Sequence, residues 1–370
     1  MQFEQGLLAT SCYALTNPLK ATRVAAQHPR MHSWPLFLLH SLIVHGLQQP
    51  DNTTPVRLLY EYPLGTWIEN IAVRSNGDLL LTILNVPHLD QLSPFKPNAT
   101  PQTIYSFPNA LTVSGIAEIS ADVFAMAVGN FTLTGGPQQG SFSIWSVGFT
   151  THGTLLEAHK ITELPQASFL NGLCSVPGTG TGSSEDILVG DLEQGLVYHV
   201  DTSTGDHRIA INNSLTAAFA VPVLGTVGVN GMHVHDGNLF FTNTGQALFG
   251  KTPIHTNGTA ADKPTIIAHV LNSSLEFDDF AIKDNDAYLV TGSGNSIEWI
   301  ELDGTLKGRI VAGSLNSTQF AEPTSCAFGR TEGDKHVLYV VTAGGLATPV
   351  DGDVSVGARV LAVDTRLWLS

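Results

Sequence analysis

The 370-residue sequence predicts an all-β fold of six similar sheets, and three observations predict it. First, one pattern recurs six times: a polar or small residue, alternating apolar residues, a turn, and a dense apolar strand. Second, the turns are rich in Asn, Asp and Gly, which is typical of β-hairpins, and no stretch has sustained 3.6-residue periodicity. Third, the copies begin about 45–60 residues apart, which leaves room for four short strands in each copy.

Each copy consists of an inner strand, a turn and a second strand. In chain order the copies cover residues 69–82, 114–129, 171–190, 230–242, 278–291 and 322–342. Residues 56–62 precede the first copy without a hairpin partner, so we expect them to pair with residues 358–364 and close a ring. Six antiparallel units closed in this way form a six-bladed β-propeller, which leaves few exposed strand edges. A β-sandwich is the alternative, but a sandwich does not repeat a polar strand start six times.

The composition excludes several classes of protein. Apolar residues make up 43% of the chain and charged residues 13%, so a large core is available and global disorder is excluded. The net charge of −15 repels phosphate backbones, so nucleic acid is not an expected partner. Since no apolar run approaches the roughly 20 residues that cross a bilayer, we expect no stable membrane span. The oligomeric state is not predicted.

Residues 1–54 differ from the rest, and we expect them to be a signal peptide or pre-region before a propeller at residues 55–370. Met31 is followed by a short apolar stretch at residues 35–44 and then by polar residues, the layout of a secretory signal that starts at Met31. A buried N-terminal helix is the alternative.

Sequons for N-glycosylation support the secretory pathway. Seven Asn-x-Ser/Thr triplets occur, at Asn52, Asn98, Asn130, Asn212, Asn257, Asn272 and Asn316. Each lies in an expected loop or strand end, so we predict a secreted glycoprotein.

The cysteines predict free thiols. Cys12 lies in the segment that we expect to be removed, whereas Cys174 and Cys326 hold comparable places in the third and sixth copies. These copies face each other across a six-fold ring, and a disulfide needs Cα atoms within about 7 Å. We therefore predict two buried, unpaired cysteines.

The strand starts predict a central site, because inner strands of a propeller begin near its axis. The equivalent residues are Glu69, Ser114, Asn171, Asn230, Asp278 and either Pro323 or Thr324. Four of them, Glu69, Asn171, Asn230 and Asp278, offer oxygen ligands that suit Ca²⁺, Mg²⁺ or Mn²⁺, and no organic cofactor is expected. Alternatively, strand-start Asn and Asp side chains bond to backbone donors of turns.

This ordered set resembles the metal-binding set of the senescence-marker-protein/gluconolactonase-like propellers. The resemblance covers about residues 55–366 and follows the order Glu69, Asn171, Asn230, Asp278. It implies a divalent cation in the pore and a role for Asp278 as general base in lactone hydrolysis.

A narrower resemblance rests on residues 67–73, 239–246 and 278–281, which look like a fungal secreted branch of these propellers. That branch is similar to the hetero-Diels–Alderases of tropolonic sesquiterpenoid biosynthesis. The resemblance implies dehydration of a hydroxymethyl tropolone to an o-quinone methide and coupling to a humulene-type olefin. The partners would be small apolar polyketide–terpenoid substrates.

These two chemistries need different pockets. Lactone hydrolysis needs a metal or base and a polar cradle for the oxyanion, whereas cycloaddition needs an apolar cavity that orients two reactants. The expected substrate-binding residues lie near strand starts or in a neighbouring loop: Trp67, Phe169, Asn243, Phe249 and Phe277. The alternative for the aromatic residues is packing between blades.

The candidate acids and bases are Asp278, Glu69, Asp279 and Glu118. The leading hypothesis is therefore a hetero-Diels–Alderase, with a metal-dependent lactonase or esterase as the alternative. A non-catalytic ligand-binding propeller is the third class.

Overall fold

The computed structural model describes residues 56–150, 154–179, 184–272, 275–304 and 308–368. Every described residue lies in one compact unit of the chain, Asn52–Ser370. The expected signal peptide, the start at Met31 and the sequon at Asn52 lie outside the described residues. Among the described residues no helix has the length and apolar character needed to span a membrane.

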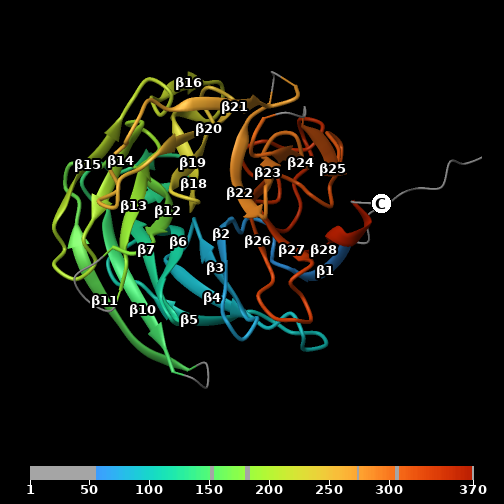
Figure 1. The fold of residues 1–370 in the computed structure, drawn as a ribbon. Coiled ribbons are helices and arrows are strands. Elements are labelled where there is room, and N and C mark those ends of the chain that lie inside the picture. Colours follow the sequence, from blue (N-terminus) through green and yellow to red (C-terminus); the bar gives the residue numbers. More distant parts are fainter. Residues whose placement is uncertain (1–55, 151–153, 180–183, 273–274, 305–307, 369–370) are drawn as a thin grey trace, which may run out of the picture. The chain divides into compact units, whose positions relative to one another are not determined.

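The described residues form six four-stranded antiparallel sheets (Figure 1). From inner to outer strand, blade one consists of β2 (Ile68–Val73), β3 (Leu79–Ile83), β4 (His88–Leu92) and β5 (Gln102–Ser106). Blade two consists of β6 (Thr112–Ser120), β7 (Val123–Gly129), β10 (Ser143–Phe149) and β11 (Leu155–Glu163). Blade three consists of β12 (Leu170–Val176), β13 (Asp186–Asp191), β14 (Leu196–Val200) and β15 (His207–Asn212). Blade four consists of β18 (Val229–His235), β19 (Asn238–Asn243), β20 (Leu248–Pro253) and β21 (Thr265–His269). Blade five consists of β22 (Phe277–Lys283), β23 (Asp286–Thr291), β24 (Ser296–Glu301) and β25 (Arg309–Gly313).

The sixth sheet joins the two ends of the propeller domain. It consists of β26 (Pro323–Phe328), β27 (Val337–Thr342), β28 (Arg359–Asp364) and, as its outer strand, β1 (Val56–Glu61). Val56 lies opposite Val363 and Glu61 opposite Arg359, whose Nε donates to Glu61 Oε2 at 3.0 Å. The predicted closure by residues 56–62 is therefore confirmed.

The six sheets form one ring. The inner strands contact one another in the order β2, β6, β12, β18, β22 and β26, and β26 contacts β2. This arrangement confirms the predicted six-bladed β-propeller. Two short hairpins, β8 (Phe131–Thr132) with β9 (Gly136–Pro137) and β16 (Phe219–Val221) with β17 (Gly225–Val227), lie outside the six sheets, and a single 3₁₀ turn, η1 (Thr365–Leu367), follows β28.

Hydroxyl groups join neighbouring blades near the axis. Four of them donate to a backbone carbonyl of the next blade at 2.6–2.7 Å: Thr82 to Ser114, Ser114 to Leu170, Thr242 to Asp278, and Thr324 to Ile68. The last bond links blade six to blade one. Since the four donor hydroxyl groups are buried, each bond also satisfies a hydroxyl group that water does not reach.

Glycine follows the polar strand start in blades two, three and four because the next inner strand lies very close. A Cβ atom on Gly115 would lie 1.9 Å from Asn171 O, and one on Gly172 would lie 1.8 Å from Asn230 O. A Cβ atom on Gly231 would lie 2.6 Å from a Cα atom of blade five. No side chain larger than hydrogen fits without moving the neighbouring backbone.

The core consists of apolar side chains packed between adjacent sheets, and it includes both described cysteines. Cys174 and Cys326 are buried and unpaired, as the sequence predicted. Burial, together with the nearby Asp279 carboxyl, raises the pKa of the Cys174 thiol to about 12. Both thiols are therefore protonated and poorly reactive in the native protein.

The described sequon asparagines are accessible to different degrees. Asn130 is half-buried, whereas the others are exposed, at Asn98, Asn212, Asn257, Asn272 and Asn316. Glycosylation and secretion remain predictions.

The buried thiols lead to a test by alkylation without reductant. We expect Cys174 and Cys326 to resist iodoacetamide in the native protein, because both are buried and protonated, and to react fully in guanidinium chloride. Peptide masses after digestion identify the alkylated residues. A cystine-linked peptide containing either residue would contradict the blade assignment.

Glu298 gives a test of stability against pH. Its side chain is 1% exposed, and burial raises its pKa to about 7, partly offset by a hydrogen bond from Leu271 N. Between its ordinary pKa of 4.5 and about 7 the folded state binds more protons than the unfolded state, so the free energy of unfolding falls as pH rises.

We expect the wild type to lose on the order of 2 kcal/mol more stability than Glu298→Gln between pH 5 and pH 8, because the amide does not ionise. Urea unfolding at both pH values measures this difference, with the exposed Glu157→Gln as control. Equal losses of stability in wild type and Glu298→Gln would contradict the raised pKa of the buried Glu298 carboxyl group.

Candidate active-site cavity

The predicted strand-start residues meet at one cavity. In every blade the pairing between the inner and second strands changes register close to the strand start. Such β-bulges redirect side chains away from the regular alternation of a strand. Glu69, Asn171, Asn230 and Asp278 lie at four of these bulges, and all four line a cavity of about 360 Å³.

These four polar residues form two hydrogen-bonded pairs. Asn171 Nδ2 donates to Glu69 Oε1 at 2.8 Å, and Asn230 Nδ2 donates to Asp278 Oδ1 at 2.7 Å. Trp67 Nε1 donates to the other oxygen of Glu69 at 2.5 Å. An amide from another blade thus holds each carboxyl group in place at the floor of the cavity: blade three supplies Asn171 to Glu69 of blade one, and blade four supplies Asn230 to Asp278 of the adjacent blade five.

Burial makes these carboxyl groups weak acids. It raises the pKa of Glu69 to about 7, although the hydrogen bonds from Asn171 and Trp67 lower it in part. The pKa of Asp278 is raised well above its ordinary value, first by burial and then by the nearby carboxyls of Glu69 and Asp279. Crowding of acidic groups in a site with little water explains both directions.

Three further carboxylates line the cavity, and sequence reasoning did not single them out: Glu193, between β13 and β14, and the pair Glu276 and Glu322. Glu276 and Glu322 each lie two residues before the polar strand-start position of their blade, the same spacing at which Trp67 and Phe169 precede Glu69 and Asn171. Applying the same two-residue spacing to blades five and six would have identified Glu276 and Glu322 from the sequence.

Backbone and hydroxyl donors fix these two side chains. Glu276 accepts hydrogen bonds from Ser293 N at 2.8 Å and Ser293 Oγ at 2.7 Å. Glu322 accepts from Ala347 N at 3.0 Å and Thr348 N at 3.1 Å. Burial raises the pKa of Glu322 to about 7, and these donors lower it in part.

The remaining wall of the cavity is mostly apolar, with Glu193, Thr226 and Thr244 as its polar members. It includes Trp67, Leu84, Phe131, Phe169, Leu192 and Leu224, and both extra hairpins contribute to it. The Phe131 ring stacks on the Phe169 ring with centroids 5.0 Å apart and an interplanar angle of 6°. The predicted binding residues Trp67 and Phe169 therefore lie in the cavity.

The other three predicted binding residues lie elsewhere. Phe249 and Phe277 are fully buried in one apolar cluster between blades four and five. Asn243 is buried as well, and its Nδ2 donates to Leu215 O and Ala217 O at 2.9 Å each. Asn243 therefore anchors the segment that leads into the β16–β17 hairpin.

Asp279 is an inter-blade link outside the cavity lining. Its Oδ2 accepts a hydrogen bond from Ser325 Oγ in blade six at 2.7 Å, and its Oδ1 lies 3.3 Å from His233 Nε2 in blade four. The Asp279 side chain is buried. One carboxylate thus connects three consecutive blades.

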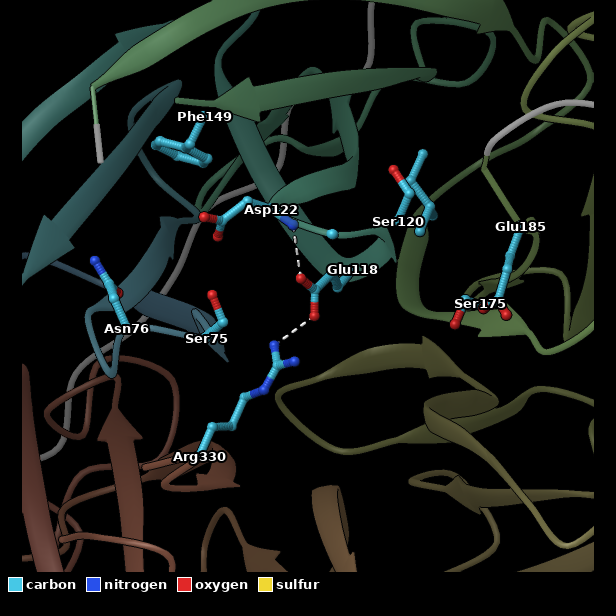
Figure 2. Close-up of a pocket in the computed structure, with 11 residues that line it drawn as sticks. Ser75, Asn76, Glu118, Ser120, Asp122, Phe149, Ser175, Glu185 and Arg330 are labelled. Atoms are coloured by element: carbon cyan, nitrogen blue, oxygen red, sulfur yellow. Dashed lines mark hydrogen bonds and ion pairs between the residues drawn. The ribbon is translucent and has the colours of Figure 1, made fainter. Parts of the chain in front are cut away.

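Glu118 lines a second cavity, of about 860 Å³, at the opposite ends of the inner strands (Figure 2). This cavity is lined by residues at the C-terminal ends of β2, β6 and β12, whereas the first cavity lies at their N-terminal ends. Glu118 accepts a hydrogen bond from Asp122 N at 2.9 Å and forms an ion pair with Arg330 (Figure 2). Glu118 is thereby separated from the other candidate acids.

The donor set of the first cavity fits a hard divalent cation. Two carboxylates and two amides, all with oxygen atoms, line one space, and Asn171 Oδ1 is buried with no hydrogen-bond partner among the described residues. No group of three or more His, Cys, Asp or Glu side chains in the described part of the chain is arranged to hold a metal. An ion at this position would therefore depend on the amides of Asn171 and Asn230.

The described residues form a six-bladed propeller with a cavity at the N-terminal ends of its inner strands, and comparisons with known proteins agree with this fold. No family model matches the chain. A protein of Phoma sp. is 26% identical over 340 residues, which cover 84% of this chain and 94% of that protein. A protein of Sarocladium schorii is 27% identical over 342 residues, which cover 84% of each chain. Both carry the provisional name hetero-Diels–Alderase.

Solved structures show the same fold. A luciferin-regenerating enzyme superposes with a TM-score of 0.59 at 13% identity, covering 84% of this chain and 94% of that one. The calcium-binding protein regucalcin from Agrobacterium tumefaciens has a TM-score of 0.57 at 15% identity, with the same coverage. These structures confirm the propeller fold that the first resemblance implied, and the two relatives confirm the resemblance to proteins named hetero-Diels–Alderase.

The different placement of two adjacent aspartates gives a test. We expect Asp279→Ala to lower the free energy of unfolding by about 1–3 kcal/mol, because it leaves the buried Ser325 hydroxyl without its acceptor. Asp278→Asn should leave stability within about 0.5 kcal/mol of the wild type or raise it, because it removes a buried ionisable group. Urea unfolding monitored by tryptophan fluorescence measures both. The reverse order of effects would contradict the assignment of Asp279 as the inter-blade link.

Proposed function

We propose that this protein is a hetero-Diels–Alderase that joins a tropolone o-quinone methide to a humulene-type sesquiterpene. The observation that carries the proposal is the axial cavity, in which an aromatic and aliphatic wall faces a floor of hydrogen-bonded carboxyl groups. The provisional names of the two relatives support the reaction class. The tropolone and humulene substrates come from the sequence resemblance.

The proposed reaction has two steps. In the first, a hydroxymethyl tropolone loses water: the hydroxymethyl oxygen departs with its own proton and the proton of the ring hydroxyl, which leaves an exocyclic C=CH₂ group beside a ring carbonyl. In the second, the CH₂ carbon bonds to one olefin carbon and the carbonyl oxygen to the other, which closes a dihydropyran ring. No oxidant or reductant is required.

The floor of the cavity suits the first step. A carboxyl group such as Asp278 can donate a hydrogen bond to the departing hydroxyl, while Glu69 can accept the proton of the ring hydroxyl. Asn171 and Asn230 hold these groups at 2.8 and 2.7 Å, so little rearrangement is needed during the reaction. General acid–base assistance of this kind contributes about 10²–10⁴-fold in rate.

The apolar wall suits the second step, which needs no nucleophile. Holding a diene and an olefin in a reactive pose can supply about 7–11 kcal/mol of the barrier. The stacked rings of Phe131 and Phe169 present a flat apolar surface to such a pair. Exclusion of water also protects the quinone methide from hydration.

A metal-dependent lactonase or esterase is the second candidate, and the unpartnered Asn171 Oδ1 favours it. Glu69, Asn171, Asn230 and Asp278 would hold a divalent cation, which would polarise a lactone carbonyl and activate water. The apolar wall would then bind the hydrocarbon part of an ester. A binding propeller without catalytic activity is the third class.

Coupling of a hydroxymethyl tropolone to α-humulene tests the proposal. We expect the wild type to give one stereoisomer of the adduct and Asp278→Asn to lower the initial rate by about 10²-fold, because the carboxyl group is lost. Chiral liquid chromatography with mass spectrometry measures both results. Glu118→Gln, in the opposite cavity, is the matched control and should keep the wild-type rate.

EDTA separates the first two candidates. Coupling that is insensitive to EDTA supports the pericyclic proposal. Lactone or ester hydrolysis that EDTA abolishes and Ca²⁺, Mg²⁺ or Mn²⁺ restores would instead support the metal-dependent hydrolase. The third class, a binding propeller, would be supported if the wild type and the Asp278→Asn variant both bind the substrates equally well and accelerate neither reaction.

A further inference from the structure

The cavity has two chemically different sides. At the position two residues before the inner-strand start, blades one and three carry the aromatic residues Trp67 and Phe169. Blades five and six carry Glu276 and Glu322 at the same position. In the ring, blade three with Phe169 lies across from blade six with Glu322, whereas blade one with Trp67 is next to blade six. Blades one and three also contribute the carboxylates Glu69 and Glu193, so the two sides differ in that only blades one and three carry an aromatic residue at this position.

Both extra hairpins add apolar surface to the aromatic side. The β8–β9 hairpin is inserted after the second strand of blade two, and the β16–β17 hairpin lies between blades three and four. Leu133 in the first hairpin and Val223 in the second line the cavity while remaining 48% and 81% exposed. Neither hairpin is needed to complete a four-stranded blade.

The tip of the β16–β17 hairpin is strained. Val223 has a φ of +72°, a left-handed conformation that β-branched residues rarely adopt. Its backbone is constrained because Val221 pairs with Gly225 on the opposite strand. A strained, highly exposed valine gains little stabilisation from the fold, and such outliers cluster at ligand-binding positions.

The acidic side is preorganised for a hydroxylated group. Ser293 fixes Glu276, and the backbone N–H groups of Ala347 and Thr348 fix Glu322, so both carboxyl groups have defined positions. A hydrocarbon placed there would remove solvent from these carboxyl groups without offering them new hydrogen-bond partners. A ring bearing hydroxyl and carbonyl oxygens would supply such partners.

We infer that the two reactants bind on opposite sides of the cavity: the sesquiterpene olefin against the β8–β9 and β16–β17 hairpins, and the oxygenated ring over Glu276 and Glu322. This inference rests on the proposed function, and it assigns each of the two reactants to one side of the cavity. It makes Leu133, Val223 and Leu224 specificity-determining residues for the hydrocarbon partner. They select the olefin without taking part in the dehydration.

Separate binding measurements of two probes, α-humulene and tropolone, test the inference by equilibrium dialysis. We expect Val223→Ser combined with Leu224→Ser to weaken α-humulene binding by about tenfold, because apolar contact area is lost, and to leave tropolone binding within about twofold. Leu133→Ser, on the other hairpin, should give the same selective loss. Glu322→Gln should weaken tropolone binding more than α-humulene binding.

Phe219→Ser is the matched control, because Phe219 lies on the same hairpin, is 51% exposed and does not line the cavity. It should bind both probes like the wild type. Equal weakening of both probes by the hairpin variants, or no weakening of either, would overturn the assignment of sides while the coupling activity still stands. If the wild type binds neither probe, the proposed function itself fails.

Discussion

The close approach of neighbouring inner strands near the axis is the constraint on which the rest of the structure depends. Gly115 and Gly172 pack directly against the backbone of the next blade, where a Cβ atom would overlap a carbonyl oxygen. The inter-blade hydroxyl bonds, such as that from Thr324 to Ile68, require the same short spacing. Since the strands lie this close, polar side chains from blades that are distant in sequence converge on one small cavity.

The sequence predicted the ring and its closure, because those depend on periodic features that a single chain displays. Repeated polar strand starts, hairpin turns and one unpartnered strand at residues 56–62 were sufficient. The convergence of Glu69, Asn171, Asn230 and Asp278 followed from the same repeat. The free thiols were predictable as well, since Cys174 and Cys326 belong to opposite blades.

The rest of the site depends on side-chain direction, which the repeat does not specify. Phe249 and Phe277 are close in sequence to cavity residues but point into the core between blades. Asp278 and Asp279 are adjacent, yet a bulge directs one to the cavity and leaves the other bonded to Ser325. The hairpin at residues 219–227 lines the cavity because of its tertiary position, which no local pattern indicates.

The outer strand of blade six has a consequence for how the protein is made. Glu61 and its partner Arg359 are 298 residues apart, so β1 emerges from the ribosome long before β28 exists. At about 5–20 residues per second, translation leaves β1 without its neighbour for roughly 15–60 s. During that interval its backbone is an open edge that can pair with another nascent chain. Efficient production of this propeller therefore depends on shielding that edge, for example by chaperones, until the last strand is synthesised.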